Sequence, residues 1–218
     1  MIRKFLRTYK GQRGITGLET AIILIAFVVV AAVFAYTALS AGLFSTQKGQ
    51  EAVYAGLKEA QSTLELKGAV IATANESGDN GRVQQISFNV ANVLGGEAID
   101  FTLPTDPASA TGQSNATSSN NKVVIKYIDQ SQTENDLWWT VTKLGSADDD
   151  YLLEMNETFK ITVGGPTAGT IPGNLIDALG TDLDVNTEFS LVVQTPVGAI
   201  LEIERTIPPY MDTIMNLR

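Results

Sequence analysis

Residues 17–47, GLETAIILIAFVVVAAVFAYTALSAGLFSTQ, decide the fold of this 218-residue chain. After Glu19 no charged residue occurs before Lys48, so residues 20–47 form an uninterrupted apolar and neutral run. As an α-helix this run would be ~42 Å long at ~1.5 Å per residue, which exceeds the ~30 Å hydrocarbon core of a bilayer. The sequence therefore predicts a helix that can cross a membrane.

The residues before the apolar run are basic. Five basic residues and no acidic one occur in the first fourteen positions: Arg3, Lys4, Arg7, Lys10 and Arg13. A basic segment ahead of a membrane helix stays on the cytoplasmic side, so the rest of the chain is expected outside the cell. The run is about twice as long as the ~7–15 residues of a secretory signal, although Ala38-Leu39-Ser40 loosely resembles its cleavage site. An uncleaved signal anchor also fits the length and the charge.

The whole chain is acidic and has neither cysteine nor histidine. A net charge of −9 argues against nucleic-acid binding, because that affinity depends on Lys and Arg meeting phosphate. The missing side chains exclude disulfides, thiolate or imidazole metal sites and Ser-His or Cys-His pairs. Asp148, Asp149 and Asp150 would point in different directions, so we interpret them as a solvated loop and not as a Ca²⁺ site. We expect no cofactor, no metal and no enzymatic activity.

Helix-forming residues continue beyond the apolar run. Four apolar residues recur there at the spacing of one helix face: Val53, Leu57, Ala60 and Leu64. The helix is therefore expected to span residues 15–67, with Gly68 as its stop. Gly42, Gly49 and Gly56 recur every seven residues, either as a line for close helix packing or by coincidence in an Ala- and Gly-rich stretch.

The junction between the basic segment and the apolar run resembles a processing site. Arg13-Gly14, then Ile15-Thr16-Gly17-Leu18-Glu19 and the apolar helix, looks like the class III leader junction of type IV pilin-like proteins. Within that superfamily, residues 10–55 are similar to the N-terminal region of archaeal flagellins. The resemblance implies that a membrane-embedded prepilin-type peptidase cuts between Gly14 and Ile15 and removes residues 1–14 as a leader. It also implies that the helix then leaves the bilayer to pack into a filament core.

Glu19 lies at the mouth of the apolar run, where a carboxylate needs a partner. Cleavage before Ile15 would create an α-amine with a pKa of ~7.7–8, and Glu19 is its i+4 neighbour on the same helix face. The resemblance to type IV pilins implies that Glu19 pairs with this amine. The sequence Thr16-Gly17-Leu18-Glu19 also fits a capping box, in which Glu19 accepts a hydrogen bond from the N–H of Thr16, even in an uncleaved chain. The two roles are compatible.

The remainder, residues 68–218, has the pattern of a β-rich domain. Segments with alternating apolar residues are separated by Gly, Pro, Asn and Asp clusters and comprise residues 86–90, 99–103, 122–128, 137–144, 157–163 and a hairpin within 188–208. About seven short strands predict an antiparallel sandwich, and the resemblance implies an immunoglobulin-like one. The fold class is therefore α+β. Trp138 and Trp139 would face opposite sides of one strand, with one of them in the core.

Three asparagines lie in N-x-S/T sequences that accept N-linked glycans in exported proteins: Asn75, Asn115 and Asn156. Residues 104–121 are rich in Ser, Thr and Asn and are expected to form an exposed loop. Asn115 is therefore the favoured acceptor. Asn75, which follows the helix, ranks second, and Asn156, which precedes a strand, ranks last.

These features together predict a structural subunit of the archaeal swimming filament, made as a membrane precursor and assembled outside the cell with copies of itself or related flagellins. The resemblance assigns cleavage to the leader peptidase, and assembly and torque to separate archaellum machinery. Two alternatives remain open at this point. An adhesive type IV pilin would share the leader and the helix, and an uncleaved membrane-anchored domain would bind a ligand at the cell surface.

Overall fold

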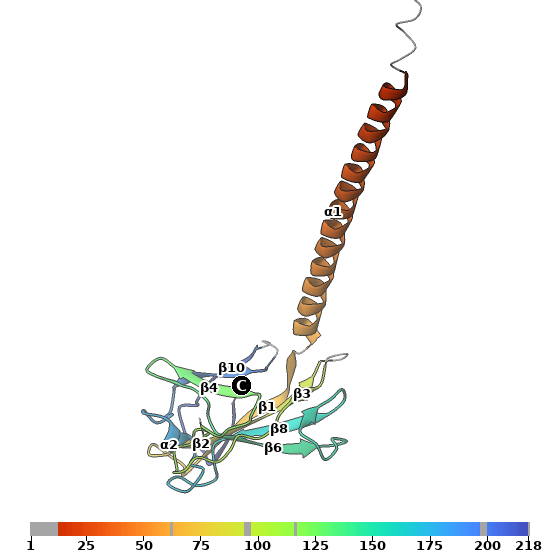
Figure 1. Cartoon of the computed structure of the whole chain (residues 1–218). Coiled ribbons are helices and arrows are strands. Elements are labelled where there is room, and N and C mark those ends of the chain that lie inside the picture. The colour runs from red at the N-terminus through yellow and green to blue at the C-terminus, as the bar shows by residue number, and fades with distance from the viewer. Residues whose placement is uncertain (1–12, 62, 94–96, 116, 197–199, 218) are drawn as a thin grey trace, which may run out of the picture. The chain divides into compact units, whose positions relative to one another are not determined.

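The structure is a computed structural model that describes residues 13–61, 63–93, 97–115, 117–196 and 200–217, with backbone only at 13–16 and 59–61. The leader expected over residues 1–14 therefore lies almost entirely outside the described residues. The chain divides into two compact units, Met1–Tyr54 and Ala55–Arg218. The first contains most of a long helix, and the second contains the end of that helix and a β domain (Figure 1).

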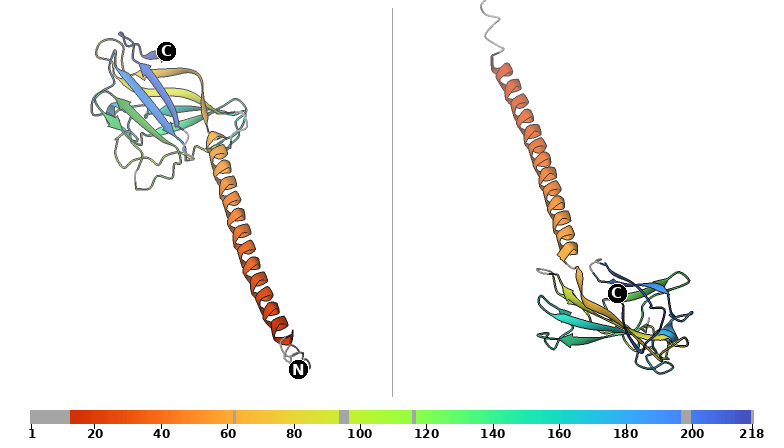
Figure 2. Two further views of the ribbon diagram at one scale, coloured as in Figure 1. Left: turned by 90° about the horizontal axis from the view of Figure 1, so that it is seen from above. Right: turned by 180° about the vertical axis from the view of Figure 1, so that it is seen from behind.

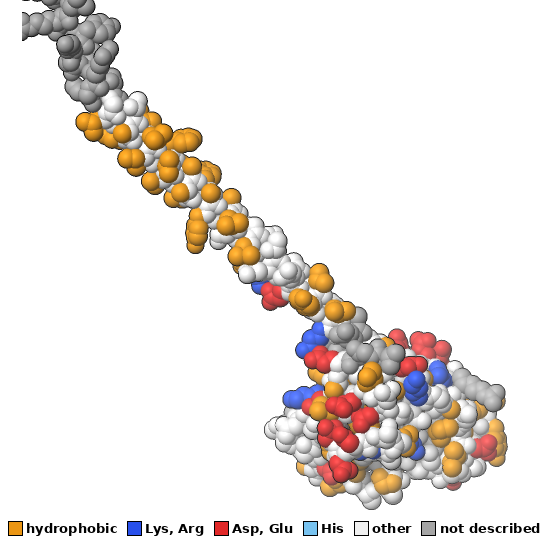
Figure 3. Space-filling view, turned by 90° about the vertical axis from the view of Figure 1, so that its right-hand side faces the viewer, with side chains coloured by type: hydrophobic (Ala, Val, Ile, Leu, Met, Phe, Trp, Pro, Cys, Tyr) orange, Lys and Arg blue, Asp and Glu red, His pale blue; other side chains and the backbone are white. Residues whose placement is uncertain are grey.

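Helix α1 spans Arg13–Gln61, a length of 49 residues. Its large apolar side chains from Leu18 to Leu57 are between 51% and 74% exposed. They occupy consecutive positions, as at residues 22–25 and 27–30, and so surround the helix instead of forming one stripe. Figure 3 shows those on one side. Two hydroxyls in this apolar segment are satisfied locally, since Thr37 donates to the carbonyl of Phe34 and Thr46 to that of Leu43. A helix that is apolar all round is stable only inside a membrane or inside protein.

The helix ends earlier than the sequence predicted. Strand β1 begins at Leu64 and spans Leu64–Ala74, so the expected boundary between residues 67 and 68 was wrong. Leu64 continued the helical stripe by spacing, but it is only 5% exposed and belongs to the β-domain core. Pairing with β2 (Val83–Asn92) satisfies the backbone of residues 64–67 and buries Leu64, so this long-range contact overrides the local helical pattern. Gly68, with φ +82°, lies where the register of β1 against β2 shifts and is not a helix stop.

The β domain consists of two large antiparallel sheets and one small strand pair. The five-stranded sheet has the order β11 (Ile214–Leu217), β1, β2, β8 (Thr158–Val163) and β6 (Trp139–Leu144). The four-stranded sheet has the order β10 (Ile200–Thr206), β9 (Glu188–Gln194), β4 (Val124–Asp129) and β5 (Thr133–Glu134). Strands β3 (Ile99–Asp100) and β7 (Leu152–Leu153) form a small pair, and α2 (Leu175–Ala178) is a single turn. Figure 2 shows the sheets from two further sides.

The core lies between the two large sheets, and the expected α+β class with an antiparallel sandwich is confirmed. The alternation predicted for residues 86–90 holds, because Ile86, Phe88 and Val90 are all buried. The expectation for the tryptophan pair also holds. Trp139 is fully buried and makes an edge contact with a core phenylalanine, Phe101, at 5.9 Å between ring centroids. Its neighbour Trp138 is half-buried on the other side of the strand.

The loop over residues 104–121 differs from the expectation. It was expected to be exposed, but Pro104, Pro107 and Gly112 are buried in it. The indole N–H of Trp138 donates to the Asp106 carboxylate at 3.0 Å, which fastens the loop to the sheet. A side chain at Gly112 would approach the Asn174 carbonyl oxygen within 2.2 Å, so the loop also packs closely against the segment before α2. A Ser-, Thr- and Asn-rich composition can pack in this way when small residues and backbone contacts replace apolar side chains.

Asp129 organises the turn between β4 and β5. One carboxylate oxygen accepts the N–H of Ser131 at 2.6 Å, and the other accepts the hydroxyl of Tyr127 at 2.9 Å and the side-chain amide of Gln132 at 3.0 Å. Gln132 in turn donates to the Thr181 carbonyl and accepts its N–H, which joins this turn to the loop before β9. Burial alone would raise the pKa of Asp129, but the hydrogen bonds from Gln132, Ser131 and Tyr127 outweigh it and lower the pKa to about 2.

This turn predicts a defined acid sensitivity. Because the folded pKa of Asp129 is about 2, below the ordinary 3.8, its stabilising contribution is complete above pH ~4 and is lost as the pH falls towards 2. We expect Asp129→Asn to lower the Tm of the detergent-solubilised chain at pH 7 by ~2–4 °C, equivalent to about 1 kcal/mol. The difference from the wild type should disappear near pH 2.

Thermal unfolding followed by circular dichroism between pH 2 and 7 measures this effect. Asp149→Asn makes the same charge change at an exposed loop position and serves as the control. A difference between Asp129→Asn and the wild type that stays constant over the whole pH range would contradict the role assigned to the carboxylate.

Candidate functional site

The functional element of the first unit is the surface of α1 itself. The segment Gly17–Lys58 is long and apolar enough to cross a membrane, since its most apolar 18-residue stretch has a mean hydropathy of 2.8 and none of that stretch is buried. Burial of a large apolar side chain is worth roughly 1.5–3 kcal/mol of free energy relative to exposure to water. A bare helix of this kind therefore cannot persist in solution. The helix surface is therefore a contact surface for lipid or for other protein chains.

The glycines of α1 are not required for packing within the chain. A side chain built at Gly42, Gly49 or Gly56 meets no atom within 4 Å. Each internal glycine nevertheless costs ~1 kcal/mol of helix stability relative to alanine. Their recurrence every seven residues agrees with close approach by another helix.

Charged pairs begin where the apolar run ends. Lys48 and Glu51 form an exposed ion pair at 2.6 Å on one face of α1. Further along the same helix, Lys58 pairs with Glu97 of the β domain at 3.2 Å. Exposed pairs of this kind contribute ~0–1 kcal/mol each, so they mark the polar end of the helix and do little to fix it.

The structure separates the two roles expected for Glu19. Glu19 is exposed on α1, and the helix begins at Arg13, before the predicted cleavage bond between Gly14 and Ile15. Thr16 therefore lies inside the helix of this uncleaved chain and is not its N-cap, contrary to the expectation that the capping box forms before processing. The helix extends further because the backbone of Arg13 to Ile15 continues it.

The three sequon asparagines differ in accessibility. Asn75 is exposed, and its side-chain oxygen accepts the N–H groups of Glu76 at 2.9 Å and Arg82 at 2.7 Å. Asn115 is partly buried, and its side-chain oxygen accepts the Thr117 N–H at 3.1 Å. Asn156 is exposed and has a φ of +70°. At Asn75 and Asn115 the side-chain oxygen stabilises the local turn. An N-linked glycan would be attached to the other atom, the side-chain amide nitrogen.

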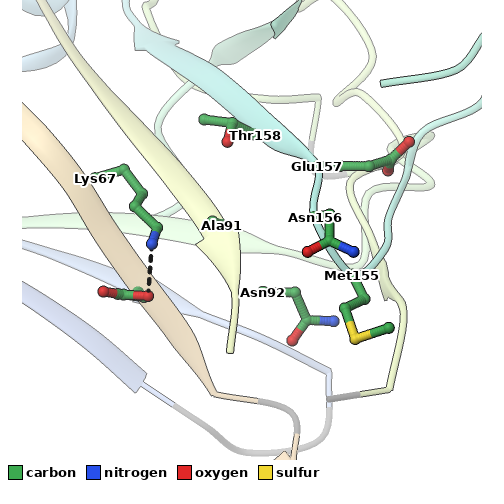
Figure 4. A pocket seen from close by; sticks show the side chains of 8 residues that line it. Lys67, Ala91, Asn92, Met155, Asn156, Glu157 and Thr158 are labelled. Carbon is green, nitrogen blue, oxygen red and sulfur yellow. Dashed lines mark ion pairs between the residues drawn. The ribbon is translucent and has the colours of Figure 1, made fainter. Parts of the chain in front are cut away.

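A polar hollow of about 260 Å³ lies beside Asn156 (Figure 4). Its lining includes Lys67, whose ammonium pairs with Glu65 at 3.1 Å, and the buried Glu157. The Glu157 carboxylate accepts the N–H groups of Asp148 at 3.1 Å and Glu154 at 3.0 Å. These charges are already used to hold neighbouring segments, so the hollow has the character of a surface depression and not of a catalytic site.

The acidic cluster at residues 148–150 agrees with the interpretation as a solvated loop. All three side chains are exposed, and the carboxylates of Asp148 and Asp150 accept backbone N–H groups two residues ahead. Over the part of the chain that the structure describes, no three acidic side chains are arranged to hold a metal ion.

Comparison with known proteins decides the family. The sequence model of archaeal-type flagellins matches residues 14–205. This chain belongs to the archaeal-type flagellin family. Probable flagellin 1 of Archaeoglobus fulgidus is 36% identical over 221 residues, which cover 97% of this chain and 98% of the relative. The chain is accordingly a structural subunit of the archaeal flagellum, the archaellum, from a family of structural proteins.

Two solved structures resemble this flagellin. The archaeal flagellum of Methanospirillum hungatei strain JF1 matches with a TM-score of 0.59 and 28% identity, over 92% of this chain and 98% of that chain. The crystal structure of the flagellin FlaB1 from Methanocaldococcus jannaschii shares the fold, with a TM-score of 0.50 and 12% identity over 72% of this chain and 96% of that chain. The expected resemblance to archaeal flagellins is thus confirmed over nearly the whole length.

Sequence reasoning missed parts of this flagellin that only pairing reveals. Strands β1, β5, β7 and β11 were not predicted, and neither was the burial of Glu157. For β1 a signal existed, because Leu64-Glu65-Leu66-Lys67 alternates with period two as well as continuing the helical stripe. For Glu157 no signal existed, since its partners are backbone N–H groups of a loop.

Proposed function

We propose that this flagellin is inserted in the membrane as a precursor, cut between Gly14 and Ile15 by a prepilin-type peptidase, and assembled with copies of itself into an extracellular filament used for swimming. The observation that carries the proposal is the apolar surface of α1, exposed on every side. Transfer from lipid to a bundle of identical helices keeps this surface out of water, and close packing supplies the gain.

The partners of this process follow from what the chain lacks. It has no Gly-x-x-x-x-Gly-Lys-Ser/Thr sequence for binding a nucleotide, so torque and the energy for assembly come from separate motor and assembly proteins. Related flagellins with the same helix are further filament partners. The family match favours this filament role over an adhesive pilin, and the flagellum structure with 28% identity over 92% of the chain favours it over an isolated anchored domain.

Processing gives the first test of the function. We expect N-terminal sequencing of filaments from the source archaeon to begin at Ile15, and Gly14→Val to block cleavage and leave the protein in the membrane. Gly17→Ala is a matched control, because a side chain there meets no atom within 4 Å. Filament protein that begins at Met1 would defeat the processing step, and a start at Ala41 would indicate an ordinary secretory signal.

Glu19 gives the second test. Glu19→Gln keeps the shape and hydrogen-bonding oxygen of the side chain but removes the charge that would pair with the Ile15 amine. We expect cleavage to proceed and the yield of sheared filaments to fall about tenfold, which corresponds to ~1.4 kcal/mol for a pair in apolar surroundings. An unchanged yield would assign Glu19 to helix capping with Thr16 alone.

Surface glycosylation is the third test, and we propose N-linked glycans at Asn75, Asn115 and Asn156. Exposure places Asn75 and Asn156 ahead of Asn115. Asn75→Asp is the sharpest variant, because it keeps the oxygen that accepts the Glu76 and Arg82 N–H groups while removing the acceptor nitrogen.

Peptide mass spectrometry of this variant should show loss of one glycan mass with filaments still formed. Asn120→Asp makes the same change at an exposed asparagine outside a sequon and should alter no glycan. Unmodified asparagine at all three positions in wild-type filaments would remove the proposal.

A further inference from the structure

The β domain has two outward sheet faces of different chemistry. On the five-stranded sheet, Lys67 of β1, Asn89 of β2, Lys160 of β8 and Thr142 of β6 are register partners in one row. The residues flanking Lys160 in β8, Phe159 and Ile161, point inward and are buried, so this row faces outward. We call the outward side of this sheet the lysine face.

The lysine face is almost free of acidic residues. Residues 64–218 contain 21 of the 24 acidic residues and eight of the 15 basic ones, yet Glu65 is the one acidic residue among the outward positions of this sheet's strands. Glu65 is already paired with Lys67 at 3.1 Å. The remaining outward positions are uncharged apart from Lys67 and Lys160, as at Ser87 and Thr162, and the polar hollow described above is lined in part by Ala91 and Thr158 of this face. Among the described residues no carboxylate lies within ion-pairing distance of Lys160.

The four-stranded sheet presents the opposite charge. Its outward side, here called the glutamate face, carries exposed Glu188 of β9 and exposed Glu202 and Glu204 of β10. The glutamate face has one basic outward residue within its strands, Lys126 of β4. Lys126 lies in the same row as Glu202, with Val192 of β9 between them. No Lys or Arg of the described chain forms an ion pair with any of these three glutamates. A hollow of about 190 Å³ lies between Glu188 and Glu204 on this side.

Apolar side chains lie among the charges of the glutamate face. Ile128 is 37% exposed and Ile200 is 59% exposed, and both stand on the outward side beside the glutamate rows. A surface that combines exposed aliphatic side chains with unpaired charges of one sign has the composition of a protein contact. Its complement must carry unpaired positive charge, which Lys160 provides on the lysine face.

Repulsion restricts how copies of this domain can touch. With 21 acidic against eight basic residues, two domains repel each other over most of their surfaces. Contact without a large electrostatic cost is available where the lysine face, whose one acidic residue is paired, meets an acidic face. Because the two complementary faces lie on different sheets of the same domain, each copy can bind one neighbour through each face. Such a heterologous contact repeats without closing and generates a helical array.

We propose that the lysine face of one flagellin subunit docks on the glutamate face of a second copy along the filament surface, with Lys160 opposite Glu202 and Glu204. This inference rests on the proposed filament function. It adds to the helix-mediated core a second, electrostatic contact between β domains.

Charge reversal with compensation tests the contact. Three variants of the full-length chain replace the wild type in its source archaeon. The first carries Lys160→Glu, the second carries Glu202→Lys with Glu204→Lys, and the third combines all three substitutions. We expect each reversal alone to lower filament yield at least about tenfold, and the triple variant to recover most of the wild-type yield because the charges are exchanged across the contact. Lys122→Glu makes the same charge reversal at an exposed lysine outside the five-stranded sheet and should leave the yield unchanged.

The amount of membrane precursor, measured by immunoblot, shows whether each variant folds. Lys160→Gln only removes the charge, so its filament yield should lie between those of the wild type and Lys160→Glu. The contact would be overturned if Lys160→Glu filaments formed in normal yield and stayed assembled at the same salt concentrations as the wild type. That result would leave the filament function intact. Failure of the triple variant to recover, with normal precursor levels, would also overturn it. Absence of filaments of the unmodified chain would instead contradict the proposed function.

Discussion

The structure depends on one constraint, an apolar helix that its own chain leaves uncovered. From Leu18 to Leu57 the large apolar side chains of α1 are more than half exposed, on all sides of the helix. Water cannot solvate this surface without a large cost, so every stage in the life of the protein has to supply a cover for it. In the proposed function, lipid covers this surface in the precursor and identical helices cover it in the filament, so assembly exchanges one apolar environment for another.

The β domain, by contrast, covers most of its large apolar residues with its own sheets. Its sheets bury aromatic and β-branched residues between them. The ring centroid of Phe101 lies 5.9 Å from those of Trp139 and Phe159, in edge contacts. The excess of acidic residues keeps the outer surface hydrated and keeps copies apart. Faces that lack this excess are therefore informative, since they are where copies can approach.

Particular residues show where local sequence patterns lose to long-range pairing. Leu64 fits both a helical stripe and a strand alternation, and pairing with Asn92 decides in favour of the strand. Gly68 was expected as a helix stop and instead lies at a register shift between β1 and β2, with a positive φ. Pro104 and Pro107, in a loop with the composition of an exposed segment, are buried because the loop folds back on the sheet beside Trp138.

The sequence by itself determined the long apolar helix, the inventory that excludes Cys and His chemistry, and most strands of the antiparallel domain, and it predicts the leader junction. These features are local, since length, charge and period two or 3.6 are written in neighbouring residues. Only the tertiary structure decided the end of the helix at Gln61, the pairing of β11 with β1, and the sorting of lysines and glutamates onto opposite sheets. Each of these depends on which distant strands pair and in which register, and a one-residue change of register would move every side chain to the other face.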